Sequence, residues 1–73
     1  MSSMMEIKIS ENLKMLIKGQ DLKQQELADE IGISQSAISS WLSGKKEPSI
    51  ESLWKLADYF DVSIDELVGR KLY

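Results

Sequence analysis

The stretch QQELADEIGISQSAISSWLS, residues 24–43, decides the fold of this chain, because it reads as two short helices joined by a tight turn. In its first half, Leu27, Ala28 and Ile31 recur at helical spacing and form one apolar stripe. Gly32 follows and can end that helix, since glycine adopts positive φ angles without steric cost. Ser34 then stands where a second helix would begin, and serine is a favoured N-cap residue.

The second helix of this stretch is predicted to bury one face and to expose another made of short, neutral side chains. The inward residues are apolar: Ala37, Ile38, Trp41 and Leu42. The outward residues carry small hydrogen-bonding groups: Gln35, Ser36, Ser39, Ser40 and Ser43. Serine is a poor helix former, because its hydroxyl competes for backbone partners. The face suits the DNA major groove, which admits an α-helix and offers donors and acceptors to Gln and Ser, but a merely small, solvated face explains it equally well.

The residues around this stretch extend the pattern. The first helix opens with LKQQELA (residues 22–28), the turn reads IGISQS (31–36), and the second helix leads into WLSGKKEPS (41–49). This order resembles the Cro/repressor-type helix-turn-helix family, the XRE or lambda-repressor-like group, over about residues 9–68. The resemblance implies an all-α, five-helix DNA-binding domain. Its second and third helices would form the helix-turn-helix, with the recognition helix at about residues 35–43 in the major groove.

Three further helices are predicted around this motif, over residues 10–18, 50–60 and 64–68. Their expected N-caps are Ser10, Ser49 and Ser63, the last within a capping box completed by Glu66. We therefore divide the chain into an N-terminal arm (1–8), a helix-turn-helix domain (9–69) and a C-terminal tail (70–73). The arm reads equally well as a flexible start or as a short edge strand that pairs with residues 71–73.

Pooling the apolar stripes of these helices predicts one hydrophobic core. Its expected members are Leu13, Leu16, Ile17, Leu22, Leu27, Ala28, Ile31, Ile33, Ile38, Trp41, Leu42, Leu53, Leu56, Ala57, Phe60, Val62, Ile64 and Leu67. Burial of so many large apolar side chains can offset the ordering entropy of a small domain.

The sequence departs from the family pattern at two places. Many relatives join an Arg of the first helix to a Glu of the third by an ion pair, whereas the matching positions here are Ile17 and Leu42. We expect these two apolar side chains to touch, since a packed apolar pair can replace a buried ion pair without loss of stability. The family also places Gly where Asp21 stands and a capping residue where Lys23 stands. Asp tolerates the left-handed conformation, and Asp21 is itself an alternative cap for the second helix.

Composition excludes several classes of function. The 73 residues suffice for one small domain, and they include neither cysteine nor histidine. Disulfides, thiolate chemistry, the usual metal ligand and the usual acid–base catalyst are therefore excluded, and we expect no enzyme, cofactor or metal site. No apolar run is long enough to cross a membrane, and the first residues do not resemble a secretory signal, so a cytoplasmic protein is expected.

The net charge of −3 is unusual for a nucleic-acid-binding domain, which is normally basic. The charges are unevenly distributed, however. Lysines lie near the ends of the helix-turn-helix: Lys18, Lys23, Lys45 and Lys46. Carboxylates gather in the last third of the chain: Glu51, Asp58, Asp61, Asp65 and Glu66. A molecule that is basic at one end can bind DNA specifically while its non-specific affinity stays weak.

The candidate DNA-binding residues are Gln24, Gln35, Ser36, Ser39, Ser40, Ser43, Lys45 and Lys46. Gln35 can pair bidentately with adenine, and serines can read neighbouring base edges. Most weight falls on Gln35, followed by Ser36 and Ser40, while Ser39 is able to turn toward a neighbouring helix. The resemblance places Lys45 and Lys46 along the phosphate backbone, although two lysines after a helix can simply complement its dipole.

The leading functional hypothesis is a small bacterial or phage transcriptional regulator, more specifically a repressor, that binds an operator in double-stranded DNA. Such proteins commonly bind as two-fold dimers, and the candidates for a homodimer interface are Met4, Met5, Trp54, Val68, Leu72 and Tyr73. Scattered exposure of the same residues is an equally good interpretation. The competing hypothesis is a protein-interaction module, such as an antitoxin-like or anti-repressor partner, with weak or no DNA binding.

Overall fold

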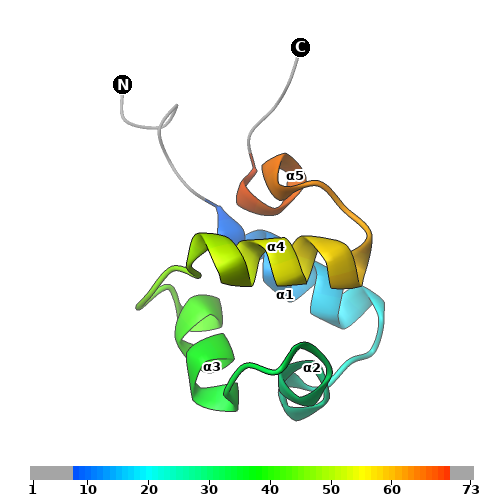
Figure 1. The fold of residues 1–73 in the computed structure, drawn as a ribbon, viewed down its shortest axis with the longest axis vertical. Helices are drawn as coiled ribbons and strands as arrows, with labels where there is room; N and C mark the ends of the chain where they lie inside the picture. The colour runs from blue at the N-terminus through cyan, green and yellow to red at the C-terminus, as the bar shows by residue number, and fades with distance from the viewer. Residues whose placement is uncertain (1–7, 70–73) are drawn as a thin grey trace.

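The computed structural model describes residues 8–69, and over this range the chain forms five α-helices and no strand (Figure 1). They are α1 (Ile9–Gly19), α2 (Gln24–Ile31), α3 (Gln35–Ser43), α4 (Ile50–Phe60) and α5 (Ile64–Val68). Helix α1 packs against α3 and α5, α2 packs against α3 and α4, and α4 packs against α5. No helix within residues 8–69 is long and apolar enough to span a bilayer. The all-α, five-helix architecture is confirmed, whereas both alternatives for the N-terminal arm, a flexible start or a strand paired with residues 71–73, lie outside the described residues.

Three of the predicted serine caps are present. The hydroxyl oxygens of Ser34, Ser49 and Ser63 each accept a hydrogen bond from the backbone N–H three residues later, at 3.2, 3.2 and 3.0 Å. The carboxylate of Glu66 also accepts from the N–H of Ser63 at 3.3 Å, which completes the predicted capping box. Helices α3, α4 and α5 therefore begin where their sequences predict.

Helix α1 begins differently, so the assignment of Ser10 as its N-cap is wrong. The helix starts at Ile9, and its N-cap residue is Lys8, which places Ser10 within the first turn. The Ser10 hydroxyl instead donates a 2.6 Å hydrogen bond to the backbone carbonyl of Leu42. This bond satisfies a carbonyl at the end of α3 that has no partner within its own helix.

The start of α2 also differs from the suggested alternative, because Lys23 and not Asp21 is its N-cap residue. The carboxylate of Glu26 accepts a 2.8 Å hydrogen bond from the backbone N–H of Lys23. Asp21 lies in the preceding turn with a φ of +52°, so it adopts the left-handed conformation that the sequence requires there.

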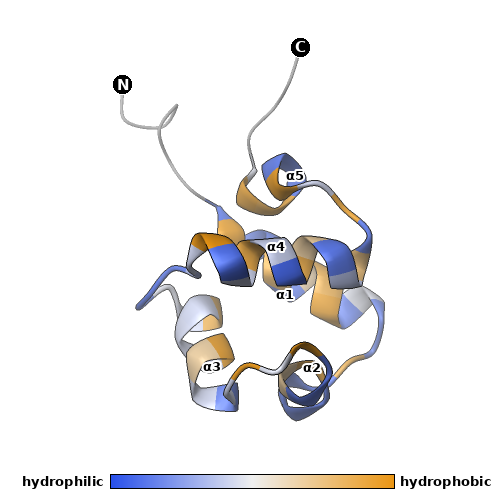
Figure 2. Cartoon of the chain, in the orientation of Figure 1, coloured by the Kyte–Doolittle hydropathy of each residue, from blue (hydrophilic) through white to orange (hydrophobic). Residues whose placement is uncertain are grey.

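The hydrophobic core lies between the helices, on their inward faces (Figure 2). Its buried members are Ile9, Leu13, Leu27, Ala28, Ile31, Ile38, Trp41, Leu42, Leu56, Ala57, Phe60 and Leu67. The other predicted core residues are half-buried and pack against this cluster: Leu16, Ile17, Leu22, Ile33, Leu53, Val62 and Ile64. Ile9 joins the core because α1 starts at this residue, one turn before Leu13 on the same face.

Helices α1 and α5 are joined by hydrogen bonds at the end of α5. The backbone N–H of Lys8 donates to the carbonyl of Val68 at 3.0 Å. The side-chain amide of Asn12 donates to the carbonyls of Glu66 and Leu67, at 3.2 and 3.0 Å. These donors bind carbonyls in the last turn of α5, where few partners are available within so short a helix.

Candidate nucleic-acid interface

The turn between α2 and α3 is fixed by backbone geometry. Gly32 has a φ of +70°, and its N–H and that of Ile33 both donate to the carbonyl of Ala28, at 2.9 and 3.1 Å. Ser34 follows in an extended conformation and caps α3. The two helices are therefore held in one relative orientation by an unbroken series of local bonds.

Helix α3 is firmly attached on one face and open on the other. Ile38 is fully buried, and Trp41 and Leu42 are only 5% and 9% exposed. The exposed polar residues of the helix are Gln35, Ser36, Ser39 and Ser43. The buried face and the hydrogen bond from Ser10 to the Leu42 carbonyl fix the helix to the rest of the domain. The exposed polar face is therefore presented on a helix whose position is fixed.

Two serines of this face are less available than their positions suggest. Ser40 is half-buried, whereas Ser39 is exposed, so Ser39 does not turn into the protein and is the more accessible of the two. The Ser43 hydroxyl donates to the carbonyl of Ser40 at 3.1 Å, which occupies its one donor. The residues free to approach a ligand are thus Gln35, Ser36 and Ser39.

The lysines after α3 sit on a loop that is bonded to the helix itself. Gly44 has a φ of +79°, and the backbone N–H groups of Lys45 and Lys46 both donate to the carbonyl of Ser40, at 3.0 and 3.3 Å. Both lysine side chains are exposed. Since their backbone is bonded to α3, both lysines stay attached beside the C-terminal end of that helix.

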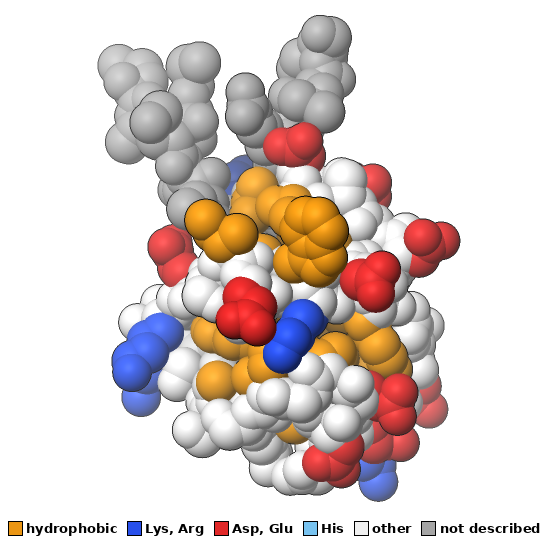
Figure 3. Space-filling view, in the orientation of Figure 1, with side chains coloured by type: hydrophobic (Ala, Val, Ile, Leu, Met, Phe, Trp, Pro, Cys, Tyr) orange, Lys and Arg blue, Asp and Glu red, His pale blue; other side chains and the backbone are white. Residues whose placement is uncertain are grey.

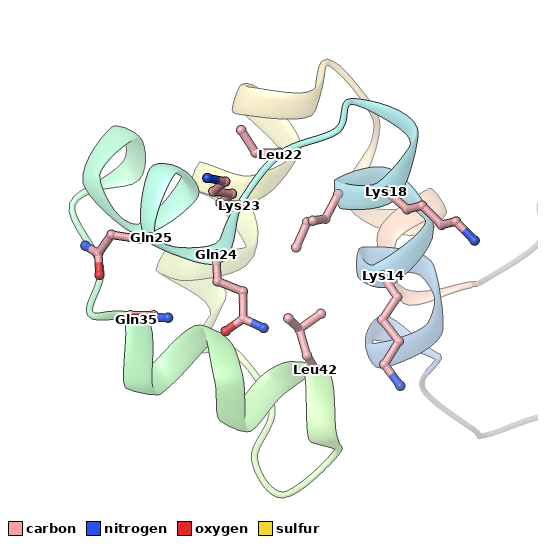
Figure 4. Close-up of a pocket in the computed structure, with 9 residues that line it drawn as sticks. Lys14, Lys18, Leu22, Lys23, Gln24, Gln25, Gln35 and Leu42 are labelled. Carbon is pink, nitrogen blue, oxygen red and sulfur yellow. The ribbon is translucent and has the colours of Figure 1, made fainter.

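Gln24, the first residue of α2, lies beside the start of α3. It is half-buried and lines a cavity of about 540 Å³ together with Gln35. In Figure 4 its side chain points toward α3, and the Leu42 side chain points into the same space. The position is suitable for bracing the first turn of α3 or for presenting an amide to a ligand that covers both helices.

Ile17 and Leu42 line this cavity together, on α1 and α3. Both are apolar, and Ile17 is half-buried against the core cluster that includes Leu42. Their direct contact stays a prediction, but the two helices that carry them pack against each other, as that prediction requires.

Another part of the surface combines apolar and acidic groups. Ile50 and Trp54 on α4 are 80% and 68% exposed and lie one helical turn apart. Figure 3 shows large apolar side chains over α4, with several carboxylates and a basic side chain around them. Exposed Glu51 and Asp58 lie on the same helix, so this face differs in charge from the lysine-bearing loop after α3.

Sequence reasoning missed several features near the interface. One is the hydrogen bond from Ser10 to Leu42, because the sequence predicts that the Ser10 hydroxyl caps the first helix instead. The cavity brings Lys14, Lys18 and Lys23 to one site from α1 and from the residue before α2. Lys14 and Lys18 are one helical turn apart, so the sequence could have predicted that these two lysines share a face of α1.

Helix α3 follows α2 after a glycine turn, buries one face against the core and exposes a polar face. This arrangement defines a helix-turn-helix protein. A family model described as "Helix-turn-helix" matches residues 13–67, which is most of the chain. The chain therefore belongs to the helix-turn-helix family, of the Cro/repressor type that its sequence resembles.

Similar proteins include several regulators. The transcriptional activator BcrR of Enterococcus faecalis is 42% identical over 86% of this chain and 31% of its own length. The cryptic phage CTXphi transcriptional repressor RstR of Vibrio cholerae is 44% identical over 88% of this chain and 57% of its own length. A crystal structure of a transcriptional regulator from Listeria innocua has a TM-score of 0.85 and 37% identity, covering 93% of this chain and 64% of that one. The chain thus spans about a third to somewhat over half of these two curated relatives.

Proposed function

We propose that this domain binds double-stranded DNA sequence-specifically, with α3 in the major groove, and acts as a transcriptional regulator. The observation that carries the proposal is the exposed face of α3, where Gln35, Ser36 and Ser39 lie free on a helix whose opposite face is buried. An α-helix fits the major groove, and short side chains let its backbone approach the base edges closely.

Within this proposal the exposed residues divide into readers and anchors. Gln35 accepts and donates through one amide, which matches the N6 and N7 atoms of adenine. Ser36 and Ser39 reach adjacent base edges, directly or through water. Lys45 and Lys46 contact phosphates, and so does the side-chain amide of Gln24, which lies at the start of α2 beside Gln35. Ser40 and Ser43 contribute less, since one is half-buried and the other donates within the helix.

The proposal extends to the mode of action. Binding involves no covalent chemistry, and a bound domain represses transcription simply by occupying the operator. A single module offers little surface, so two copies would bind half-sites about one helical turn, or roughly 34 Å, apart. Trp54 is the exposed member of the expected homodimer interface, Val68 is half-buried, and the other candidates lie outside the described residues. A cytoplasmic location follows from a DNA target.

A DNA titration tests the proposal. The protein is titrated with DNA from upstream of its own gene and with a scrambled duplex of equal length, at several salt concentrations. A specific complex that weakens as salt rises supports DNA binding, because phosphate neutralisation releases counterions. Equal affinity for both duplexes, or no complex at low salt, overturns the proposal.

The second candidate function is a protein-interaction module that keeps the fold but binds DNA weakly. It is favoured by the exposed Ile50 and Trp54 within acidic surroundings, which is a surface suited to a protein and unsuited to a phosphate backbone. A relative named Antitoxin PezA, from Streptococcus pneumoniae, is 36% identical over 85% of this chain. A stable protein complex together with indifference to DNA would favour this candidate.

A further inference from the structure

The cavity between α1, α2 and α3 combines two kinds of wall. Its apolar residues are Ile17, Leu22 and Leu42, and its cationic residues are Lys14, Lys18 and Lys23. Its volume is about 540 Å³ and it is wide open to solvent, so a small ligand in it would stay partly exposed. The remaining lining residues are glutamines, so the cavity can offer apolar contact, amide hydrogen bonds and positive charge together.

The charge of this cavity is opposite to that of the chain. The protein has 12 acidic and 9 basic residues, yet no carboxylate is among the residues that line the cavity. Lys14, Lys18 and Lys23 are all exposed, so their long side chains are free to reorient over the opening. In Figure 4 the side chains of Gln24 and Leu42 point into the space between the helices, whereas those of Lys14 and Lys18 extend from α1 away from it. The cavity therefore has an apolar floor, and the lysines at its edge, the basic rim, reach a ligand only by turning toward the opening.

We propose that this cavity binds a small amphipathic anion, a carboxylate attached to an apolar body. The apolar body would cover Ile17, Leu22 and Leu42, and the carboxylate would meet the lysines at the rim. The apolar floor argues against a bare phosphate, which gains nothing from contact with leucine. The basic rim argues against a neutral apolar compound, which gains nothing from three ammonium groups.

The location gives this ligand a regulatory effect, and this step depends on the proposed function. Gln24 and Gln35 line the cavity and also belong to the candidate DNA-binding set. A ligand between them would occupy space at the first turns of α2 and α3, and its carboxylate would neutralise nearby lysines. DNA and the anion therefore compete, so the ligand releases the operator.

The test uses the full chain without DNA and three probes of similar size or charge: hexanoate, 1-hexanol and inorganic phosphate. Backbone amide shifts are followed by NMR at Leu22, Gln24, Gln35 and Leu42, and at Ile50 and Trp54 as an exposed apolar control. We expect saturable shifts around the cavity with hexanoate, in the millimolar range typical of so small a ligand. We expect much smaller shifts with either of the other probes.

Each other outcome overturns the proposal in a distinct way. Equal binding of phosphate would make the cavity a plain anion site, and equal binding of 1-hexanol would remove the role of the lysines. Shifts as large around Trp54 as around Gln24 would mean that hexanoate binds non-specifically to exposed apolar side chains. Absence of saturable shifts with all three probes would mean that no such site exists.

Charge variants provide the matched control. The double variant Lys14→Gln/Lys18→Gln should weaken hexanoate binding by about five-fold, the upper range for an exposed ion pair. The control Lys8→Gln/Lys55→Gln removes the same charge away from the cavity and should leave hexanoate binding unchanged; an equal loss in both would overturn the site. Competition with DNA is measured separately. Hexanoate binding without DNA binding would support the anion site and overturn the proposed function. DNA binding without hexanoate binding would support the proposed function and overturn the anion site.

Discussion

Ser10 and Leu42, 32 residues apart in sequence, are joined by a 2.6 Å hydrogen bond from the Ser10 hydroxyl to the Leu42 carbonyl. The bond connects the first turn of α1 to the last turn of α3. It is partly buried, so neither group can exchange it freely for water. The position of the candidate recognition helix thus depends on a residue that contacts no part of its exposed face.

Replacing Ser10 by alanine should destabilise the domain without changing its proposed reading surface. The Leu42 carbonyl would lose a partly buried hydrogen bond, which is worth about 0.5–1.5 kcal/mol. The free energy of unfolding, measured by urea denaturation, should fall by this amount. Ser36→Ala is the control, since Ser36 is exposed and its loss should cost less than about 0.5 kcal/mol. Equal stability of the two variants would contradict the role given to Ser10.

Replacing Gln35 by alanine should weaken specific DNA binding without destabilising the domain. We expect specific DNA affinity to fall by about 1–3 kcal/mol, the value of one bidentate base contact, and discrimination at one base pair to be lost. The unfolding free energy should hardly change, because Gln35 is exposed. Fluorescence anisotropy with labelled operator DNA measures the first effect. The control is Gln25→Ala, which removes an amide bonded to Asp29 at 3.0 Å on α2. A similar loss of affinity in both variants would contradict the assignment of Gln35 as a base reader.

Lys45→Gln and Lys46→Gln should weaken binding to all DNA sequences alike. Each substitution removes one phosphate contact, so the slope of log affinity against log salt should fall by about 1 per lysine. The titration is repeated at four or more salt concentrations to obtain that slope. Lys55→Gln, on α4, should leave the slope unchanged. A change in sequence preference, with no change in slope, would mean that these lysines contact bases.

Asp61→Gly should stabilise the domain. Asp61 ends α4 with a φ of +57°, a conformation that costs a residue with a Cβ roughly 1 kcal/mol and costs glycine little. The unfolding free energy should rise by about 0.5–1 kcal/mol. Asp58→Gly removes the same charge within the helix and should lower stability by about 1 kcal/mol. A loss of stability in both variants would show that the Asp61 side chain stabilises the turn more than its conformation costs.

Local signals account for the features that the sequence predicts well. The caps at Ser34, Ser49 and Ser63 lie three residues from their partners, so spacing alone identifies them. Apolar periodicity identifies the core for the same reason, because each helix presents its own stripe. The exposed face of α3 is predicted in the same way, because it consists of the residues that lie opposite the apolar stripe.

Features that depend on distant residues could not be predicted in this way. Ser10 has a good local role as an N-cap, and only the packing of α1 against α3 shows its actual partner, Leu42. Ser40 lies on the outward side of α3 by periodicity, yet the backbone of the following loop folds onto its carbonyl and it is half-buried. The cavity likewise exists only because three helices meet there.

The bonds that join Lys8 and Asn12 to the end of α5 bring the two ends of the described range, Lys8 and Gly69, together beside α5 (Figure 1). A fluorophore attached at Gly69 therefore starts beside α5, on the opposite side of the molecule from α2 and the start of α3. A single-molecule experiment can use a label at Gly69 to follow DNA binding from a position off the exposed face of α3.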